Sequence, residues 1–109
     1  MSNSWQVFDI DAIRRTLAGD RVQYKEFLNV PSLTCGVYHL PAGSKDMQSH
    51  HDEDEVYFVL EGRARMQVGD EEKRVSAGNV LFVKATETHS FFEIEEDMTL
   101  LVFFATEVN

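Results

Sequence analysis

The sequence predicts an all-β protein, built as a sandwich or a barrel. Short apolar stretches recur between residues 33 and 105, and turn-forming residues separate them at nearly regular intervals. One stretch alternates Ala64, Met66 and Val68 with polar neighbours, which is the two-residue period of a strand with one buried face. The chain has 109 residues, 43% of them hydrophobic, so it can bury the core of a single domain.

A short helix is expected at residues 9–18, before the strands begin. Its apolar positions at helical spacing are Ile10, Ile13 and Leu17. Asp9 or Asp11 can cap its start, and Gly19 is a suitable stop. Because it is short, we expect it to pack against the main body as an appendage.

Two strands are expected next. The first covers residues 23–28, and Pro31 breaks the pattern after it. The second covers residues 33–40 and has the stronger strand composition. A turn follows at residues 41–43, where proline and glycine occur together.

Six further strands are expected in the rest of the chain. Their ranges are 56–60, 64–68, 73–75, 80–83, 89–94 and 98–105. The turns between them are expected at 61–62, 69–72, 76–79 and 95–97, with a polar loop before residue 89. Several strands are apolar on both faces, so a further layer has to cover them. The N-terminal segment can cover part and a second subunit the rest, which predicts a homodimer.

Composition and charge exclude several classes of partner. Ten basic and nineteen acidic residues give a formal charge of −9, which argues against binding nucleic acid or an anionic membrane. The single cysteine, Cys35, rules out an intrachain disulfide framework. The first residues do not resemble a signal peptide, and no apolar run has the length of a membrane span. We therefore expect a soluble, cytoplasmic protein.

The stretch from Gly43 to Gly62 carries the densest chemistry. His50 and His51 run into four acidic residues, and an apolar strand follows at once. Imidazole and carboxylate groups beside a rigid strand indicate a metal site with nitrogen and oxygen ligands. The alternative is a polar turn that makes the start of a buried strand soluble.

Two motifs resemble those of the cupin family. Gly43, His51, Glu55 and Gly62 resemble the first cupin motif, in which two histidines, a glutamate and a glycine follow a leading glycine. Residues 78–89 resemble the second motif, which ends in one further histidine, here His89. Its usual proline and glycine are replaced by Lys84 and Thr86. The resemblance covers roughly residues 33–104.

The resemblance implies an antiparallel jelly-roll β-barrel and a divalent metal ion, either Fe, Mn, Ni or Zn. The implied ligands are His51, Glu55 and His89. It also implies that residues 33–109 form the barrel. The helix and lead-in strand of residues 1–32 would then pack on it within one domain.

The first histidine of the family pattern is missing. If His51 is the second histidine, the first position is Ser49, which is a poor ligand. If His50 is the second, the first position is Gln48, and this pair resembles the mannose-phosphate isomerase branch of the cupins. Parity favours His51, because it then shares one strand face with Glu55. Gln48 is the next candidate ligand, and His50 competes with His51.

The family resemblance implies a metal-dependent enzyme acting on a small oxygen-rich metabolite, with dioxygenase, lyase or sugar-isomerase chemistry. Tyr57 shares the inward face of its strand and is a candidate proton donor. Glu93 shares parity with His89 and is a candidate acid or base. The alternative is a non-catalytic cupin that binds or stores a small molecule, with or without a metal.

Overall fold

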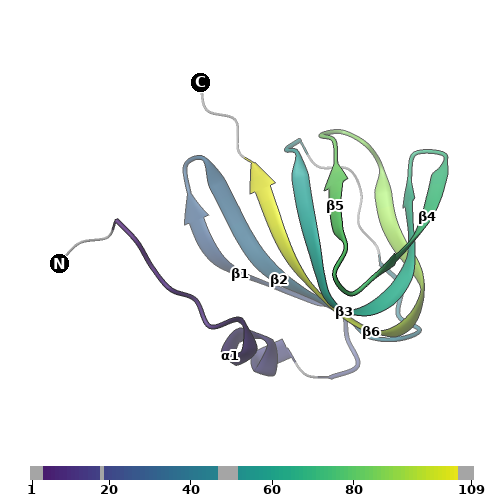
Figure 1. Cartoon of the computed structure of the whole chain (residues 1–109), viewed down its shortest axis with the longest axis horizontal. Helices are drawn as coiled ribbons and strands as arrows, with labels where there is room; N and C mark the ends of the chain where they lie inside the picture. Colours follow the sequence, from purple (N-terminus) through teal and green to yellow (C-terminus); the bar gives the residue numbers. More distant parts are fainter. Residues whose placement is uncertain (1–3, 18, 47–51, 106–109) are drawn as a thin grey trace.

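The structure, a computed structural model, describes residues 4–17, 19–46 and 52–105. Its elements are α1 (Ile10–Arg14), the 3-10 helix η1 (Arg15–Leu17), β1 (Gln23–Val30), β2 (Leu33–Leu40), β3 (Glu55–Val68), β4 (Glu71–Ser76), β5 (Val80–Val83) and β6 (His89–Ala105). The predicted all-β class is confirmed, with one short helix at the start (Figure 1). Neither helix of the described part has the length and apolar character that a membrane crossing needs.

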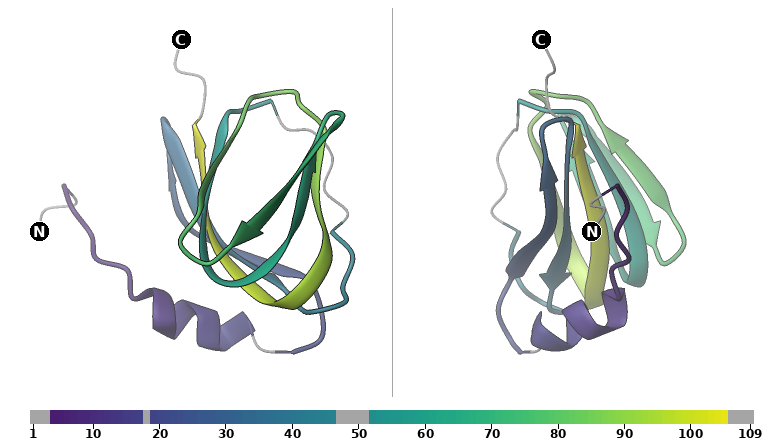
Figure 2. Two further views of the ribbon diagram at one scale, coloured as in Figure 1. Left: turned by 45° about the vertical axis from the view of Figure 1, so that its right-hand side comes forward. Right: turned by 90° about the vertical axis from the view of Figure 1, so that its left-hand side faces the viewer.

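The strands form one antiparallel sheet that folds back on itself. Its order is β1-β2-β6-β3-β4, and β5 pairs with β3 as well. The first half of β3 lies between β5 and the second half of β6, whereas its second half lies between β4 and the first half of β6. Figure 2 shows the two resulting halves facing each other. This is the predicted jelly-roll arrangement; within the described residues β4 and β5 are not paired with each other, so the sheet does not close.

Two expected turns prove to be bends within long strands. β3 runs through residues 61–62, and β6 runs through residues 95–97. Gly and acidic residues favour turns locally, but β3 and β6 remain paired and absorb the bend as register shifts between Val59 and Arg65. Gly62 adopts a φ of 93°, a conformation that suits glycine.

The register shifts change which residues of β3 face inward. Tyr57 and Val59 are fully buried before the bend, and Ala64 and Met66 are buried after it. The core lies between the two halves of the sheet and consists of Tyr38, Leu40, Tyr57, Val59, Ala64, Met66, Val75, Val83, Phe91, Ile94, Met98, Leu100 and Val102. A strand of this length therefore contributes to both walls of one core.

The N-terminal helix is shorter than expected and is attached to the sheet by charge. Asp9 is its N-cap, because the Asp9 Oδ1 atom accepts a hydrogen bond from the backbone N–H of Ala12 at 3.2 Å. Arg14 forms an ion pair with Glu61 on β3. Glu61 also accepts a hydrogen bond from the Thr99 hydroxyl at 2.9 Å. One carboxylate thus joins the helix to β3 and β6.

We expect replacement of Glu61 by glutamine to reduce stability near neutral pH but not at acid pH. Hydrogen bonding to Arg14 lowers the pKa of Glu61, against the opposing effect of burial, and Thr99 lowers it further. A carboxyl whose pKa is lower in the folded state stabilises the fold above its unfolded pKa of about 4.3, and this contribution disappears as the pH falls through the folded pKa. Urea unfolding at pH 7 should show a loss of about 0.5 kcal/mol for Glu61→Gln, since the pair is half exposed.

At pH 3 the two proteins should have equal free energies of unfolding. A difference that stays constant from pH 7 to pH 3 would show that the charge of Glu61 is not what joins α1 to the sheet.

Candidate active site

Glu55 and His89 meet inside the barrel although they are far apart in the sequence. Glu55 is the first residue of β3 and His89 is the first residue of β6, and the two long strands bend across the core between them. His89 lies directly opposite Val68, at the far end of β3. The Glu55 Oε1 and His89 Nε2 atoms are 3.3 Å apart, and both side chains are 1% exposed. A carboxylate and an imidazole that are buried side by side are typical of a functional site. We call the site around Glu55 and His89 the centre.

The orientation of His89 is set by the backbone. Its Nδ1 atom lies 3.0 Å from the carbonyl oxygen of Glu87, and a carbonyl oxygen can only accept a hydrogen bond. Nδ1 therefore carries the proton, and in the neutral ring the lone pair is on Nε2, the atom that faces Glu55. A metal-binding histidine is oriented in the same way, with one nitrogen fixed by an outer hydrogen bond and the other directed at the cation.

The environment of His89 favours positive charge. Burial by itself would lower the pKa of His89, but the Glu55 carboxylate and the Glu87 carbonyl outweigh it and raise the pKa above its usual value. Asp46 adds a weaker effect of the same sign. A proton or a metal cation on Nε2 would therefore be stabilised by the same carboxylates.

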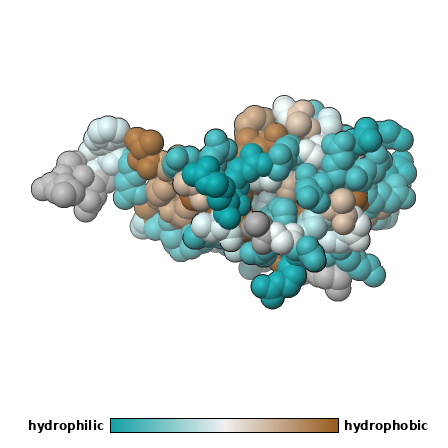
Figure 3. Space-filling view, turned by 90° about the horizontal axis from the view of Figure 1, so that it is seen from below, coloured by the Kyte–Doolittle hydropathy of each residue, from teal (hydrophilic) through white to brown (hydrophobic). Residues whose placement is uncertain are grey.

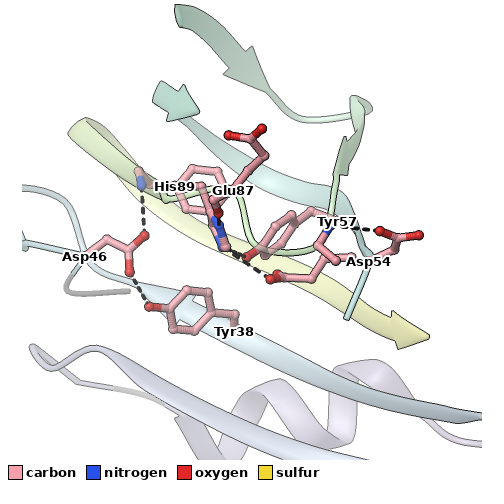
Figure 4. Close-up of polar contacts among 9 residues, drawn as sticks. Tyr38, Asp46, Asp54, Tyr57, Glu87 and His89 are labelled. Carbon is pink, nitrogen blue, oxygen red and sulfur yellow. Dashed lines mark hydrogen bonds and ion pairs between the residues drawn. The ribbon is translucent and has the colours of Figure 1, made fainter. Parts of the chain in front are cut away.

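Tyr57 completes the centre and lies on the same face of β3 as Glu55. Its hydroxyl is 3.1 Å from Nε2 of His89, and the whole residue is buried (Figure 4). The Tyr57 ring packs edge-on against Phe91, with ring centroids 5.3 Å apart. This contact fixes the position of the hydroxyl, so Tyr57 can donate a proton to, or take one from, an atom that binds next to His89.

A second buried carboxylate, Asp46, links two neighbouring strands, β2 and β6, beside the centre. It accepts a hydrogen bond from the Tyr38 hydroxyl at 2.6 Å and another from the backbone N–H of Phe91 at 2.8 Å (Figure 4). Burial, together with Asp46, raises the pKa of Tyr38 far above its usual value, so Tyr38 remains a neutral donor. Asp46 thus connects β2 to the part of β6 that carries His89.

Asp54 fixes the residue at which β3 begins. The Asp54 Oδ1 atom accepts a hydrogen bond from the backbone N–H of Ala85 at 2.8 Å, and its carbonyl oxygen accepts one from Ala105 at 3.0 Å. Figure 4 shows Asp54 at the far side of the centre from Asp46. Glu55 therefore starts from a backbone that is tied to β6 and to the loop after β5.

The structure places the remaining candidates differently. Gln48, His50 and His51 lie outside the described residues. Glu93 does not join the centre: its φ of 47° interrupts the alternation of β6, and its side chain is 61% exposed, 3.7 Å from Arg65 on the outer surface. Within residues 4–17, 19–46 and 52–105, no three histidine, cysteine or acidic side chains are grouped for a metal ion. The described part of the centre thus holds two candidate ligands, Glu55 and His89.

Sequence reasoning missed three residues near this centre: Asp46, Tyr38 and Tyr24. Asp46 lies in a polar stretch without periodicity, so its partners were not visible in the sequence. Tyr24 and Tyr38 are directly opposite each other on β1 and β2, and their rings are 6.1 Å apart. Burial, then the negative charges of Glu26, Cys35 and Glu55, raises the pKa of Tyr24 to about 12. The only sign in the sequence was that Tyr38 lies two residues before the apolar Leu40 and therefore on the same face of its strand.

A cavity of about 770 Å³ opens between β4 and β5. Its inner walls include Leu81 and Val83, which lie directly opposite Tyr57 and Glu55 across the sheet. Its rim carries Lys73 and Lys84 together with acidic residues. Glu55, Tyr57 and His89 are not among its lining residues, but Met66, Val75 and Val83 belong to the same core as Tyr57.

The family profile described as "Cupin domain" matches residues 36–104, which includes all of β3 to β5 and most of β6. The chain belongs to the cupin family. An uncharacterized protein of Streptomyces coelicolor is 39% identical over 100 residues, which are 92% of this cupin and 95% of that protein.

Two solved structures show the same fold. An RmlC-like cupin with a double-stranded β-helix fold from Methanocaldococcus jannaschii has a TM-score of 0.77 at 14% identity, covering 97% of this chain and 93% of that one. The DMSP lyase DddQ from Ruegeria pomeroyi has a TM-score of 0.75 at 23% identity. That match covers 83% of this cupin but only 49% of the lyase chain. At these identities the likeness concerns the fold alone.

The donor atoms of the centre are suited to a divalent metal ion. Two ligands of one ion, each about 2.1 Å from it, lie roughly 3 Å apart. The Glu55 and His89 donor atoms are 3.3 Å apart. The Glu55 carboxylate raises the pKa of His89, so the contact favours a proton on Nε2 or, in its place, a metal cation between the two donor atoms.

Proposed function

We propose that this cupin binds a divalent metal ion through Glu55 and His89 and acts on a small oxygen-rich metabolite. The observation that carries the proposal is the buried pair itself: a carboxylate and an imidazole 3.3 Å apart, with Nδ1 of His89 occupied by the Glu87 carbonyl. The remaining protein ligands would come from Gln48, His50 and His51. Two nitrogen or oxygen ligands from the barrel wall suit Fe, Mn, Ni or Zn.

The bound ion would act as a Lewis acid that polarises an oxygen of the metabolite. Tyr57 would hold or move a proton at that oxygen, because its hydroxyl is 3.1 Å from the ligand nitrogen and its ring cannot shift against Phe91. Burial of the centre excludes water, which strengthens each of these interactions. The reaction classes that this arrangement supports are dioxygenase, lyase and sugar-isomerase chemistry.

The metal content of the purified protein tests the proposal. After reconstitution with Mn, Fe, Ni or Zn and removal of free ions, elemental analysis should find close to one ion per chain. Glu55→Gln removes the ligand charge while keeping the shape of the side chain, and its metal content should fall below about a tenth of that value. Glu93→Gln is the matched control, because Glu93 lies on the outer surface and its loss should leave the metal content unchanged.

Equal metal content in wild type and Glu55→Gln would place the ion elsewhere. A protein that takes up no ion under any of these conditions, yet binds a small polar metabolite, would favour the alternative function, a non-catalytic binding cupin.

A further inference from the structure

The cavity between β4 and β5, which we call the slot, adjoins the centre. Among the described residues the edges of β4 and β5 are not paired with each other, which leaves this gap in the sheet. Three residues that line the slot are the direct cross-strand partners of the central residues: Val83 of Glu55, Leu81 of Tyr57, and Val68 of His89. Directly opposed residues have Cβ atoms about 5 Å apart, so the slot begins one side chain away from the centre.

The inner walls of the slot are apolar. Met66, Val75 and Val83 are core residues that are no more than 5% exposed. Val68 and Leu81 pack against the same core. The volume of about 770 Å³ lies within the usual range of small-molecule sites, roughly 300–1,000 Å³. An apolar body that enters the slot is removed from water, which favours its binding.

The rim of the slot carries charges of both signs. They belong to two lysines and three acidic residues, which leave a net charge of −1: Lys73, Lys84, Asp70, Glu71 and Glu87. Within residues 4–17, 19–46 and 52–105, none of these five side chains forms an ion pair. Seen from below, the part of the barrel furthest from the N-terminal segment is mainly hydrophilic, with small apolar areas between the polar side chains (Figure 3). The rim therefore offers partners both to a cationic and to an anionic group of a ligand.

Glu71 and Lys73 place opposite charges next to each other on the inner face of β4. Their cross-strand partners on β3, Val68 and Met66, both pack in the core. Residues two apart on a strand share one face and are about 7 Å apart. An ammonium group and a carboxylate group of one small molecule fit between them, with the ammonium at Glu71 and the carboxylate at Lys73.

Ligands with a single sign of charge match the rim less well. A carboxylate or phosphate that the two lysines attract is repelled by three carboxylates, in a chain whose formal net charge is −9. An uncharged apolar molecule would cover charged groups without pairing them. A zwitterion pairs with both signs and carries no net charge for the chain to repel. Lys84 replaces the usual proline of the second cupin motif, so its charge belongs to this chain and not to the family pattern.

We propose that the slot binds a small zwitterion with an apolar body, such as a free amino acid with an aliphatic side chain. Its ammonium group contacts Glu71 and its carboxylate contacts Lys73, while its apolar body lies against the inner walls. The inference goes beyond the metal centre. The three central side chains do not line the slot, so the zwitterion binds there whether or not an ion is present.

Titration calorimetry on metal-free protein tests the proposal with three probes of one shape. L-Leucine carries both charges, 4-methylpentanoate lacks the ammonium group, and 3-methylbutylamine lacks the carboxylate. We expect leucine to bind at least about 10-fold more tightly than either analogue, because each analogue leaves one charged side chain on the inner face of β4 without a partner.

Two variants assign the charges. Lys73→Met should weaken leucine binding by about 10-fold without weakening that of 3-methylbutylamine, which has no carboxylate. Glu71→Gln should weaken leucine binding by about 10-fold without weakening that of 4-methylpentanoate, which has no ammonium group. Glu72→Gln is the matched control, because Glu72 is exposed, lies opposite Gln67 on the outer face and does not line the slot. It should bind all three probes as the wild type does.

Circular dichroism should show all three variants folded. A wild type that does not bind leucine, or that binds the three probes equally, would overturn the proposal. So would an equal loss of leucine binding in Glu72→Gln. Because the protein is metal-free, none of these outcomes bears on whether Glu55 and His89 hold an ion, which the metal content decides separately.

Discussion

Replacing His89 with alanine should lower the affinity for a divalent metal by at least about 100-fold while the barrel stays folded. His89 provides the only imidazole in the described part of the centre, and Glu55 alone cannot hold the ion in a defined geometry. Calorimetric titration of the metal-free protein with Ni²⁺ or Mn²⁺ measures the effect. Because the side chain leaves a cavity of its own shape, added imidazole should restore part of the affinity.

His39→Ala is the control for this experiment. His39 lies on β2, and its Nε2 atom contacts the Gly19 carbonyl at 3.2 Å, outside the centre. Its replacement should leave the affinity for metal unchanged. If His89→Ala bound Ni²⁺ as tightly as the wild type, the assignment of His89 as a ligand would be wrong.

Replacing Gly62 with alanine should destabilise the protein by about 4 kcal/mol or more, a large part of the stability of a domain of this size. Gly62 lies at the bend of β3 with a φ of 93°, which is unfavourable for alanine. A Cβ atom there would lie 2.8 Å from the Cα of Met98 and would overlap the carbonyl oxygen of Asp97. Both are backbone atoms of β6, so neither can move without unpairing the strands. Urea unfolding followed by circular dichroism measures the loss.

Gly78→Ala separates the clash from the backbone strain. Gly78 has the same φ of 93°, but a Cβ atom there would meet nothing within 4 Å. We expect Gly78→Ala to cost about 1–2 kcal/mol, which is the strain alone. Equal losses in the two variants would show that close approach of β3 and β6 at the bend does not stabilise the fold.

The bend at Gly62 is also what assembles the centre. It lets β3 carry Glu55 and Tyr57 in one half of the sheet and pair with the strand of His89 in the other. A turn at the same place would have divided β3 into two independent strands. The contact between Glu55 and His89 therefore depends on β3 and β6 being continuous.

Much of this fold was visible in the sequence because it follows from local pattern. β2 and β5 have the predicted bounds, since strong apolar runs end at clear turn residues in both cases. The predicted turns at 61–62 and 95–97 were wrong because the long-range pairing of β3 with β6 outweighs the local preference of glycine and acidic residues for turns. Local preference is decisive only where no partner strand competes with it.

The sequence by itself determined the family and the all-β class, and it placed Glu55 and Tyr57 on one face of their strand, because these depend on motif spacing and on two-residue periodicity. Only the tertiary structure decided the rest. It placed Asp46 on Tyr38 and on the strand of His89, and it turned Glu93 outward at an irregular φ. These contacts join residues on different strands, and their geometry depends on register and bends that no local pattern records.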